Sequence, residues 1–187
     1  THTVKVKCID NALNEIEKSS NVTPPKIVNP TITQANQSPS GTWAQTRTYK
    51  ITYNNTDVET PYYYFKSQVS GTVSSGVVVQ SCGTGNEPST CSNINTTTEI
   101  EPNIWYRTNN KEVLITYNTT LTTSNKYLYA VTYDGTNLSG LSGSATQTIG
   151  LMDIIVPEIK IELSGSNRNG WYIGDVTGTI TNPNTVP

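Results

Sequence analysis

The sequence holds few of the side chains that enzymes use for proton transfer or nucleophilic attack. Its only histidine is His2, at the start of the chain. A Ser-His-Asp or Cys-His arrangement needs a histidine held beside its nucleophile, and a frayed terminus is a poor place for one. Zinc sites built from His and Cys lack sufficient ligands for the same reason. We therefore expect neither an enzyme nor a cofactor.

The carboxylates and amides provide two weaker candidates for chemistry. Glu99 and Glu101 lie two apart, a spacing that on a strand puts both side chains on the same face. A glycosidase pair must flank a bond across a cleft, so a solvated strand edge is the alternative interpretation. Asp10 and Asn11 in one predicted turn, and Asp134 in another, offer oxygen ligands for Ca²⁺. Neither turn supplies a six-ligand set, so we expect no metal and keep these three residues as calcium candidates.

Two of the three cysteines bracket a loop rich in Gly, Pro, Ser and Thr. The spacing of Cys82 and Cys91 suits a disulfide at the tip of a hairpin. A metal site is the alternative, but no histidine or further cysteine lies nearby. A disulfide indicates an oxidising compartment, outside the cytosol. Cys8 alternates with valines on a predicted strand, and is either a buried thiol or paired with a cysteine before residue 1.

The densest aromatic run covers residues 62–65. On a strand, Tyr62 and Tyr64 face one way and their neighbours face the other. One pair should enter the core. The other pair either packs beneath the insertion at residues 70–100 or forms, with Trp105, a surface for a sugar ring or a protein partner.

Composition limits the class of protein. Hydrophobic residues make up 34% of the chain and charged residues only 14%, while Thr, Asn and Ser are abundant. Thr and Tyr favour strands, whereas Asn, Ser and Gly favour turns. The net charge of −2, with scattered Lys and Arg, provides no cationic surface for nucleic acid. No apolar run approaches the ~20 residues of a membrane-spanning helix. The composition predicts an all-β protein with polar loops.

Short alternating segments separated by turn residues run along the whole chain. The clearest is Tyr127–Tyr133, which the turn Asp134-Gly135 follows. Thr3–Ile9 alternates in the same way, and residues 15–20 after it form a charged linker. Further strands are predicted within residues 27–33, 49–53, 62–69, 77–82, 104–106, 113–117, 145–149, 159–163 and 176–180. Turn signals at ~8–12-residue spacing indicate a sandwich or a barrel.

Two parts of the chain open alike. Pro24–Ile27 leads to Ser40–Trp43 and then to an alternating strand, and Pro157–Ile161 leads to Asn169–Tyr172 and another alternating strand. Two strand ends also match, because Val6–Asn11 and Ala130–Gly135 both end in Asp and a turn residue. That second match is imperfect, since Cys8 falls opposite Thr132 rather than an apolar residue. Internal likeness of this kind indicates an array of repeats.

These motifs resemble the tandem immunoglobulin-like (Ig-like) repeats of bacterial cell-surface proteins. The resemblance is carried by residues 3–14 as a closing strand, 153–161 as a junction and 169–172 as a turn, and it is poor over residues 55–125. It implies a two-sheet sandwich, secretion, and a role as spacer, stalk or adhesin. It brings no catalytic residues with it.

We therefore expect an all-β, immunoglobulin-like β-sandwich, with one complete central domain flanked by parts of neighbouring Ig-like units. Residues 1–20 would be the closing strand of a preceding unit with its linker. Residues 21–153 would be the central domain with an enlarged, disulfide-closed insertion. Residues 154–187 would be the opening strands of a following unit, which makes the chain a piece of a longer protein.

The expected function is a structural spacer in a stalk or fibre of an extracellular or cell-surface protein. Its partners would be the neighbouring Ig-like domains, and neither nucleic acid nor a transmembrane segment is expected. The alternative is an adhesin-type binding module. It would recognise a glycan or a host surface protein through the strand at residues 62–65 and the insertion at residues 70–100.

Overall fold

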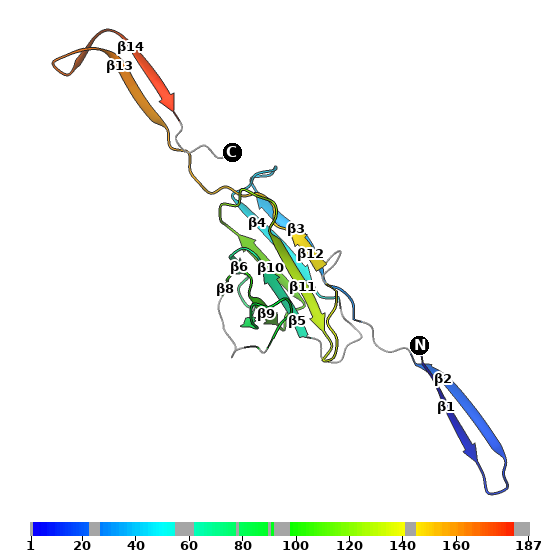
Figure 1. Ribbon diagram of the computed structural model, residues 1–187. Helices are drawn as coiled ribbons and strands as arrows, with labels where there is room; N and C mark the ends of the chain where they lie inside the picture. The colour runs from blue at the N-terminus through cyan, green and yellow to red at the C-terminus, as the bar shows by residue number, and fades with distance from the viewer. Residues whose placement is uncertain are drawn as a thin grey trace.

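The computed structural model describes residues 2–22, 27–54, 62–77, 79–89, 91, 98–140 and 145–181. These residues form two five-stranded sheets and two separate hairpins, with antiparallel pairing between the strands. Figure 1 shows the two sheets as stacked layers in the middle of the molecule, with one hairpin beyond each end. The prediction of an all-β sandwich is confirmed. Among the described residues, no helix has the length and apolarity to cross a membrane.

The two sheets together form what we call the central sandwich. The first has the order β3 (Thr31–Ser38), β4 (Thr46–Thr52), β10 (Glu112–Tyr117), β6 (Gly71–Val73) and β8 (Glu99–Ile100). The second has the order β12 (Thr146–Thr148), β11 (Tyr127–Tyr133), β5 (Tyr62–Ser67), β9 (Trp105–Thr108) and β7 (Val79–Ser81). Most neighbours within a sheet are not consecutive in the chain, so the chain crosses repeatedly between the layers.

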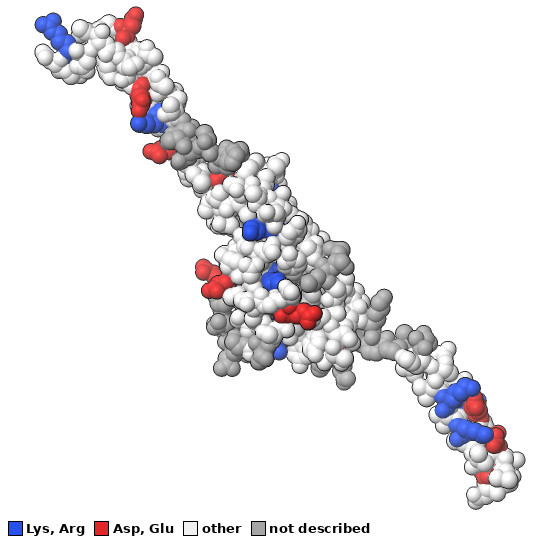
Figure 2. Space-filling view, viewed as in Figure 1, with Lys and Arg blue, Asp and Glu red and all other residues white. Residues whose placement is uncertain are grey.

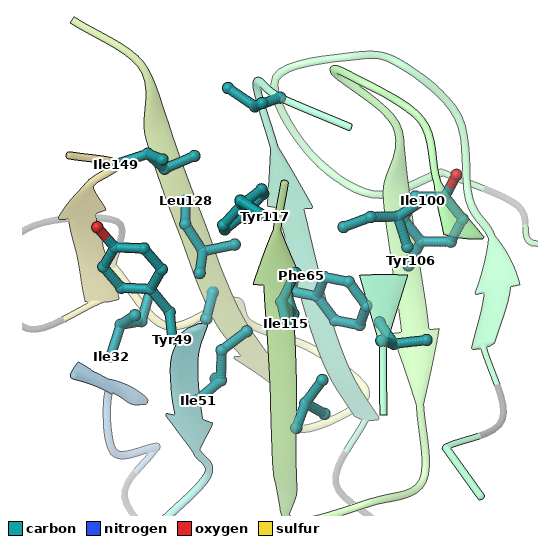
Figure 3. Packing of buried hydrophobic residues seen from close by; sticks show 14 of the residues in the cluster. Ile32, Tyr49, Ile51, Phe65, Ile100, Tyr106, Ile115, Tyr117, Leu128 and Ile149 are labelled. Atoms are coloured by element: carbon teal, nitrogen blue, oxygen red, sulfur yellow. The ribbon is translucent and has the colours of Figure 1, made fainter. Parts of the chain in front are cut away.

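One apolar core fills the space between the two sheets (Figure 3). Strands β4 and β10 bury alternate residues, as strands with one face on a core must. The largest buried side chains include Tyr49 and Tyr117, whose rings meet edge to face at 5.8 Å, and Phe65, which stacks on Tyr106 at 5.7 Å. Aromatic pairs in these arrangements add about 0.5–1.5 kcal/mol to their area burial.

The hydroxyls of the three most central tyrosines have hydrogen-bond partners. Tyr117 donates to Ser67 Oγ at 2.9 Å, and Tyr53 donates to the carbonyl of Tyr64 at 2.9 Å. The Tyr49 hydroxyl accepts from the Gly150 amide, also at 2.9 Å. Burial raises the pKa of Tyr117 and of Tyr53 well above the usual value, so both remain protonated donors. These bonds remove the penalty of burying polar groups.

Arg47 occupies an inward position of β4 and is only 5% exposed. Its guanidinium donates to the carbonyls of Thr42 at 2.6 Å and Leu151 at 3.1 Å, and also reaches the side-chain oxygens of Gln34 and Gln37. A side chain at Gly150 would lie 2.7 Å from the guanidinium carbon, so this backbone approach depends on glycine. Arg47 therefore ties the β3–β4 turn to the chain as it leaves the sandwich.

The first hairpin pairs β1 (His2–Ile9) with β2 (Glu15–Val22). The prediction that residues 15–20 form a linker is wrong, because they belong to β2. Two of the charged residues that indicated a linker, Glu15 and Glu17, lie on one face of this strand and pair with lysines of β1, while Lys18 lies on the other face.

The second hairpin pairs β13 (Lys160–Arg168) with β14 (Trp171–Thr181). The sequence predicts that the strand within residues 159–163 ends there, because Ser164-Gly165 favours a turn, but the strand continues past a register shift between Gly165 and Asn167. The chain reverses instead at Asn169-Gly170, where both residues have positive φ. Several segments named above lie outside the described residues: Pro24 to Lys26, residues 78, 90 and 92–97 of the insertion, and residues 182–187.

Candidate functional site

The predicted disulfide between Cys82 and Cys91 is present. It closes the disulfide loop (residues 82–91) against the outer face of the second sheet. Ser89 strengthens the closure, since its amide and its hydroxyl donate to the Cys82 carbonyl at 2.8 and 3.0 Å. The loop is tied to the sheet at Gly85, whose carbonyl accepts from Trp105 Nε1 at 3.0 Å and Lys66 Nζ at 3.1 Å.

A second, smaller apolar cluster lies beneath this loop, on the side of the sheet away from the main core. Tyr64, Trp105, Val131 and Cys82 are its buried members. Residues of β5 and β9 that point outward would face water without the loop. The loop therefore has its own packing role, and it turns the outer face of the sheet into a second buried layer.

The three residues predicted as ligand contacts come together on this outer face, but they differ in access. Trp105 is wholly buried and Tyr64 is 7% exposed, which matches the alternative in which the aromatic run packs beneath the insertion. Tyr62 is 38% exposed. Of the three, only Tyr62 offers much of its ring to an incoming ligand.

Two cations extend the aromatic face. Lys66 Nζ lies 4.7 Å from the centre of the Trp105 ring, and burial lowers the pKa of this lysine. The Arg107 guanidinium lies 5.3 Å from the centre of the Tyr62 ring, and Gln80 Oε1 accepts its Nε–H at 2.8 Å. Each cation–π contact at a partly exposed site contributes about 0.5–1 kcal/mol.

A groove of ≈ 620 Å³ runs between the disulfide loop and the turn after β11. Its described lining is Tyr64, Glu87, Pro88, Ser89, Tyr133, Thr136, Asn137 and Leu138. The lining combines aromatic rings with hydroxyl, amide and carboxylate groups. Glu87 is the one carboxylate among the described lining residues, so they offer no acid–base pair.

The two turns that held the calcium candidates use their carboxylates internally. Asp134 Oδ1 accepts from the amides of Thr136 at 2.8 Å and Asn137 at 2.7 Å. Asp10 Oδ1 accepts from two amides of its own turn, both at 2.9 Å. The Asn14 side-chain amide also donates to Asp10 Oδ2 at 2.9 Å, and this bond, with the amide of Asn14, holds the pKa of Asp10 below the usual value; the amides of Asn137 and Thr136 do the same for Asp134. Asn11 lies in the Asp10 turn, and no group of three or more His, Cys, Asp or Glu able to hold a metal gathers in the described part of the chain.

The remaining candidates lie at strand edges. Glu99 is exposed on β8, the last strand of its sheet, and Glu101 is exposed just after it. Cys8 is exposed on β1 and unpaired among the described residues, so the prediction of a buried thiol is wrong, while pairing with a cysteine before residue 1 stays a prediction.

Each terminal hairpin has one polar face and one apolar face. On β1–β2, ion pairs between Lys5 and Glu17 at 2.9 Å and between Lys7 and Glu15 at 2.7 Å occupy one face, and these charges are visible in Figure 2. The opposite face carries Val4, Val6, Cys8, Ile16 and Val22, together with His2, Lys18 and Ser20. All of these residues are exposed. A face of this kind is typical of a strand pair that packs on something else.

Hairpin β13–β14 is divided in the same way. One face carries Lys160, Glu162, Ser164 and a row of threonines, and the other carries Ile161, Leu163, Val176 and Ile180. Ile161 is 63% exposed and Ile180 is 71% exposed. An isolated two-stranded hairpin is marginally stable at best in water. Both hairpins therefore lack the covering layer that their patterns require.

Sequence reasoning missed Arg47 and the groove. A basic residue in phase with Tyr49 and Ile51 is the signal that could have identified Arg47. The groove has no comparable signal, because its walls come from segments far apart in the chain. Comparisons with protein-family models, with curated proteins and with solved structures found no match for this chain.

Proposed function

We propose that the chain is a structural module of an extracellular multidomain protein, in which immunoglobulin-like units follow one another as a stalk or fibre. The observation that supports this most is the pair of terminal hairpins, each with an exposed apolar face. The central sandwich is complete without them, because its core is closed by its own two sheets. The hairpins then belong to neighbouring units, and the disulfide favours an oxidising location.

The first hairpin corresponds to the last hairpin of the central sandwich, β11–β12. The inward side of β11 carries Leu128, Ala130 and Thr132, and the apolar face of β1 carries Val4, Val6 and Cys8 in the same order before the turn. When the two strands are aligned, Cys8 falls at the position of Thr132. In the sequence alone this counts as a mismatch, but both residues lie on the face that corresponds to the inward side of β11. Both strands then end in an Asp whose carboxylate accepts two amides of the turn.

The second hairpin corresponds to the first hairpin of the central sandwich, β3–β4. Each has a register shift partway along the pair: β3 carries an extra residue between Gln34 and Asn36, and in the second hairpin the shift between Gly165 and Asn167 leaves the extra residues on β14. In both, branched apolar residues lie on one face next to the register shift. The chain thus has the order expected of a repeat array: the end of one unit, one whole unit, and the start of the next.

The stalk proposal can be tested with serial fusions of two and four copies of the whole chain, measured in dilute solution by small-angle X-ray scattering. A stalk of separate units should give a maximum dimension that rises roughly in proportion to the number of copies. Fusions that collapse into one compact particle would contradict the proposal.

A second candidate function is glycan or protein binding at the groove, which the combination of aromatic, hydroxyl and amide groups favours. Such linings suit uncharged sugars, because rings stack on aromatic side chains while hydroxyls pair with amides and carboxylates. The test is a glycan array followed by titration of any hit.

If a sugar binds, Tyr133→Ala and Asn137→Ala should each weaken binding by about tenfold or more, since a lost stacking or hydrogen-bonding group is worth about 1–2 kcal/mol. Tyr127→Ala is the matched control, because Tyr127 lies on the same side of β11 as Tyr133 but outside the groove. Equal loss in Tyr127→Ala and Tyr133→Ala would exclude the groove as the site.

A further inference from the structure

The first and last hairpins of the central sandwich face each other across its core. β3–β4 belongs to one sheet and β11–β12 to the other, and β12 also contacts β3. The Tyr49 hydroxyl on β4 accepts from the amide of Gly150, two residues after β12, at 2.9 Å. Ile32 and Tyr49 share the core with Leu128 and Ile149 (Figure 3). The packing of a first hairpin on a last hairpin is therefore already present in this chain.

The terminal hairpins supply the same two partners in unpaired form. β13–β14 has the inward pattern of a first hairpin, and β1–β2 has the inward pattern of a last hairpin. They are placed beyond opposite ends of the central sandwich (Figure 1), so they do not cover each other within one molecule. We infer that the apolar face of β13–β14 in one copy packs on the apolar face of β1–β2 in a second copy. This inference rests on the proposed array of units and names the contact between them.

Packing of β13–β14 on β1–β2 is favoured over packing of either hairpin on a second copy of itself. Lys18 lies opposite Val6 on the apolar face of β1–β2. Two such faces packed together would bring two ammonium groups into one apolar contact, which is unfavourable. Against β13–β14, the single Lys18 can lay its stem along apolar side chains and keep its charge in water.

Packing of one β13–β14 hairpin on a second β13–β14 hairpin would leave a gap. Leu163 lies opposite Gly178 on the apolar face of β13–β14, and Gly165 precedes the register shift on the same face. Two copies of this face would bring glycine positions together and leave space unfilled. The valines of β1 can fill that space instead.

Head-to-tail contact has a definite consequence for assembly. A contact between two different surfaces does not close on itself, so each added copy exposes a new free hairpin. A face two strands wide, with about 3.3 Å per residue along each strand and about 4.8 Å between strands, covers less than the roughly 800 Å² per partner of a standard stable interface, so the association should be weak and depend on concentration. The expected species are short open chains that grow with protein concentration.

The test uses full-length variants in which one hairpin is blocked by charge. Val4→Lys with Val6→Lys blocks β1–β2, and Ile161→Lys with Ile180→Lys blocks β13–β14. A Cys8→Ser background prevents intermolecular disulfides, and the corresponding inward position of β11 also carries a hydroxyl residue, Thr132, which is buried without a hydrogen-bond partner. Sedimentation velocity over a range of concentrations gives the size of the species.

The unblocked chain should form oligomers that grow with concentration, and each blocked variant alone should remain monomeric. An equimolar mixture of the two should form a 1:1 dimer and nothing larger, because each variant keeps one working hairpin. The mixture also shows that the unblocked hairpin of each variant is folded. Ser164→Lys with Thr177→Lys is the control: it places two charges on the polar face of β13–β14 and should associate like the unblocked chain.

Three results would overturn the inference. They are an unblocked chain that stays monomeric at every concentration, a blocked variant that associates alone, and a mixture that forms no dimer. A monomeric chain whose serial fusions are still extended would reject this contact and leave the stalk proposal standing. Compact fusions would reject the stalk proposal itself.

Discussion

Arg47→Met is expected to destabilise the central sandwich by about 3 kcal/mol. The substitution keeps the apolar stem of the side chain but removes its donors. The carbonyls of Thr42 and Leu151 then lose the partner that joins the β3–β4 turn to the chain after β12. Thr42 is exposed and the Leu151 carbonyl keeps a hydrogen bond from the Ala44 amide, so the cost comes from losing the hydrogen bonds of a buried, charged guanidinium, which contribute about 1.5–3 kcal/mol. Chemical denaturation followed by tryptophan fluorescence measures the change.

Two further variants separate this effect from a general loss of positive charge. Arg47→Lys keeps the charge but not the planar fork of donors, so it should recover only part of the lost stability. Arg107→Met removes an arginine on the outer face of β9, where the guanidinium packs over Tyr62, and should cost less than about 1 kcal/mol. If Arg47→Met lowered the stability no more than Arg107→Met, the hydrogen bonds of Arg47 to the β3–β4 turn and to the chain after β12 would have no structural importance.

Removing the disulfide by Cys82→Ser with Cys91→Ser should cost about 2–3 kcal/mol. The bond joins residues separated by 9 positions, and closing a loop of that size removes about this much chain entropy from the unfolded state. The variant should still fold, since Ser89 and Gly85 continue to anchor the loop. The loop will open more often, so Trp105 should become accessible to quenchers.

Thermal unfolding and acrylamide quenching of Trp105 fluorescence measure these two effects. Cys8→Ser is the control, because Cys8 is a free thiol outside the sandwich and its loss should change neither readout. A double-serine variant with unchanged stability and unchanged quenching would mean that the loop is held entirely by its hydrogen bonds.

Local patterns in the sequence were sufficient for the fold class and for the disulfide. Tyr127–Tyr133 alternates over seven residues and is β11, and the Cys82–Cys91 spacing predicted the bond that is present. Alternation identifies a strand because the side chains of one strand point in turn to its two faces, a pattern that can be read within a single short segment. It does not identify partners, so the order β3-β4-β10-β6-β8 was not accessible from pattern alone.

The errors have physical causes that belong to particular residues. Glu15 and Glu17 suggested a linker because charge usually marks a solvated loop, but here they form one face of a strand that pairs with lysines across the hairpin. Gly165 suggested a turn, but it precedes a register shift in a strand that continues. In both cases the partner strand decided the outcome.

The candidate site was accessible only in part. The sequence indicated an aromatic face near Tyr62 and Tyr64 and, as the alternative, an insertion that covers it. It did not indicate which of the aromatic side chains stay accessible to a ligand. Coverage depends on the path of the disulfide loop, which is fixed by contacts such as Trp105 to Gly85 across the outer face. The groove beside Tyr133 exists because the disulfide loop forms one of its walls.

The central claim is that the sandwich supports itself while the two hairpins need partner faces. Amide hydrogen exchange of the dilute monomeric chain tests it most directly, strand by strand. Amides of β4, β10 and β11 should exchange only through global unfolding, whereas those of β1–β2 and β13–β14 should exchange almost as fast as an unfolded chain. Hairpin amides protected as strongly as those of β10 in the dilute monomer would contradict the claim.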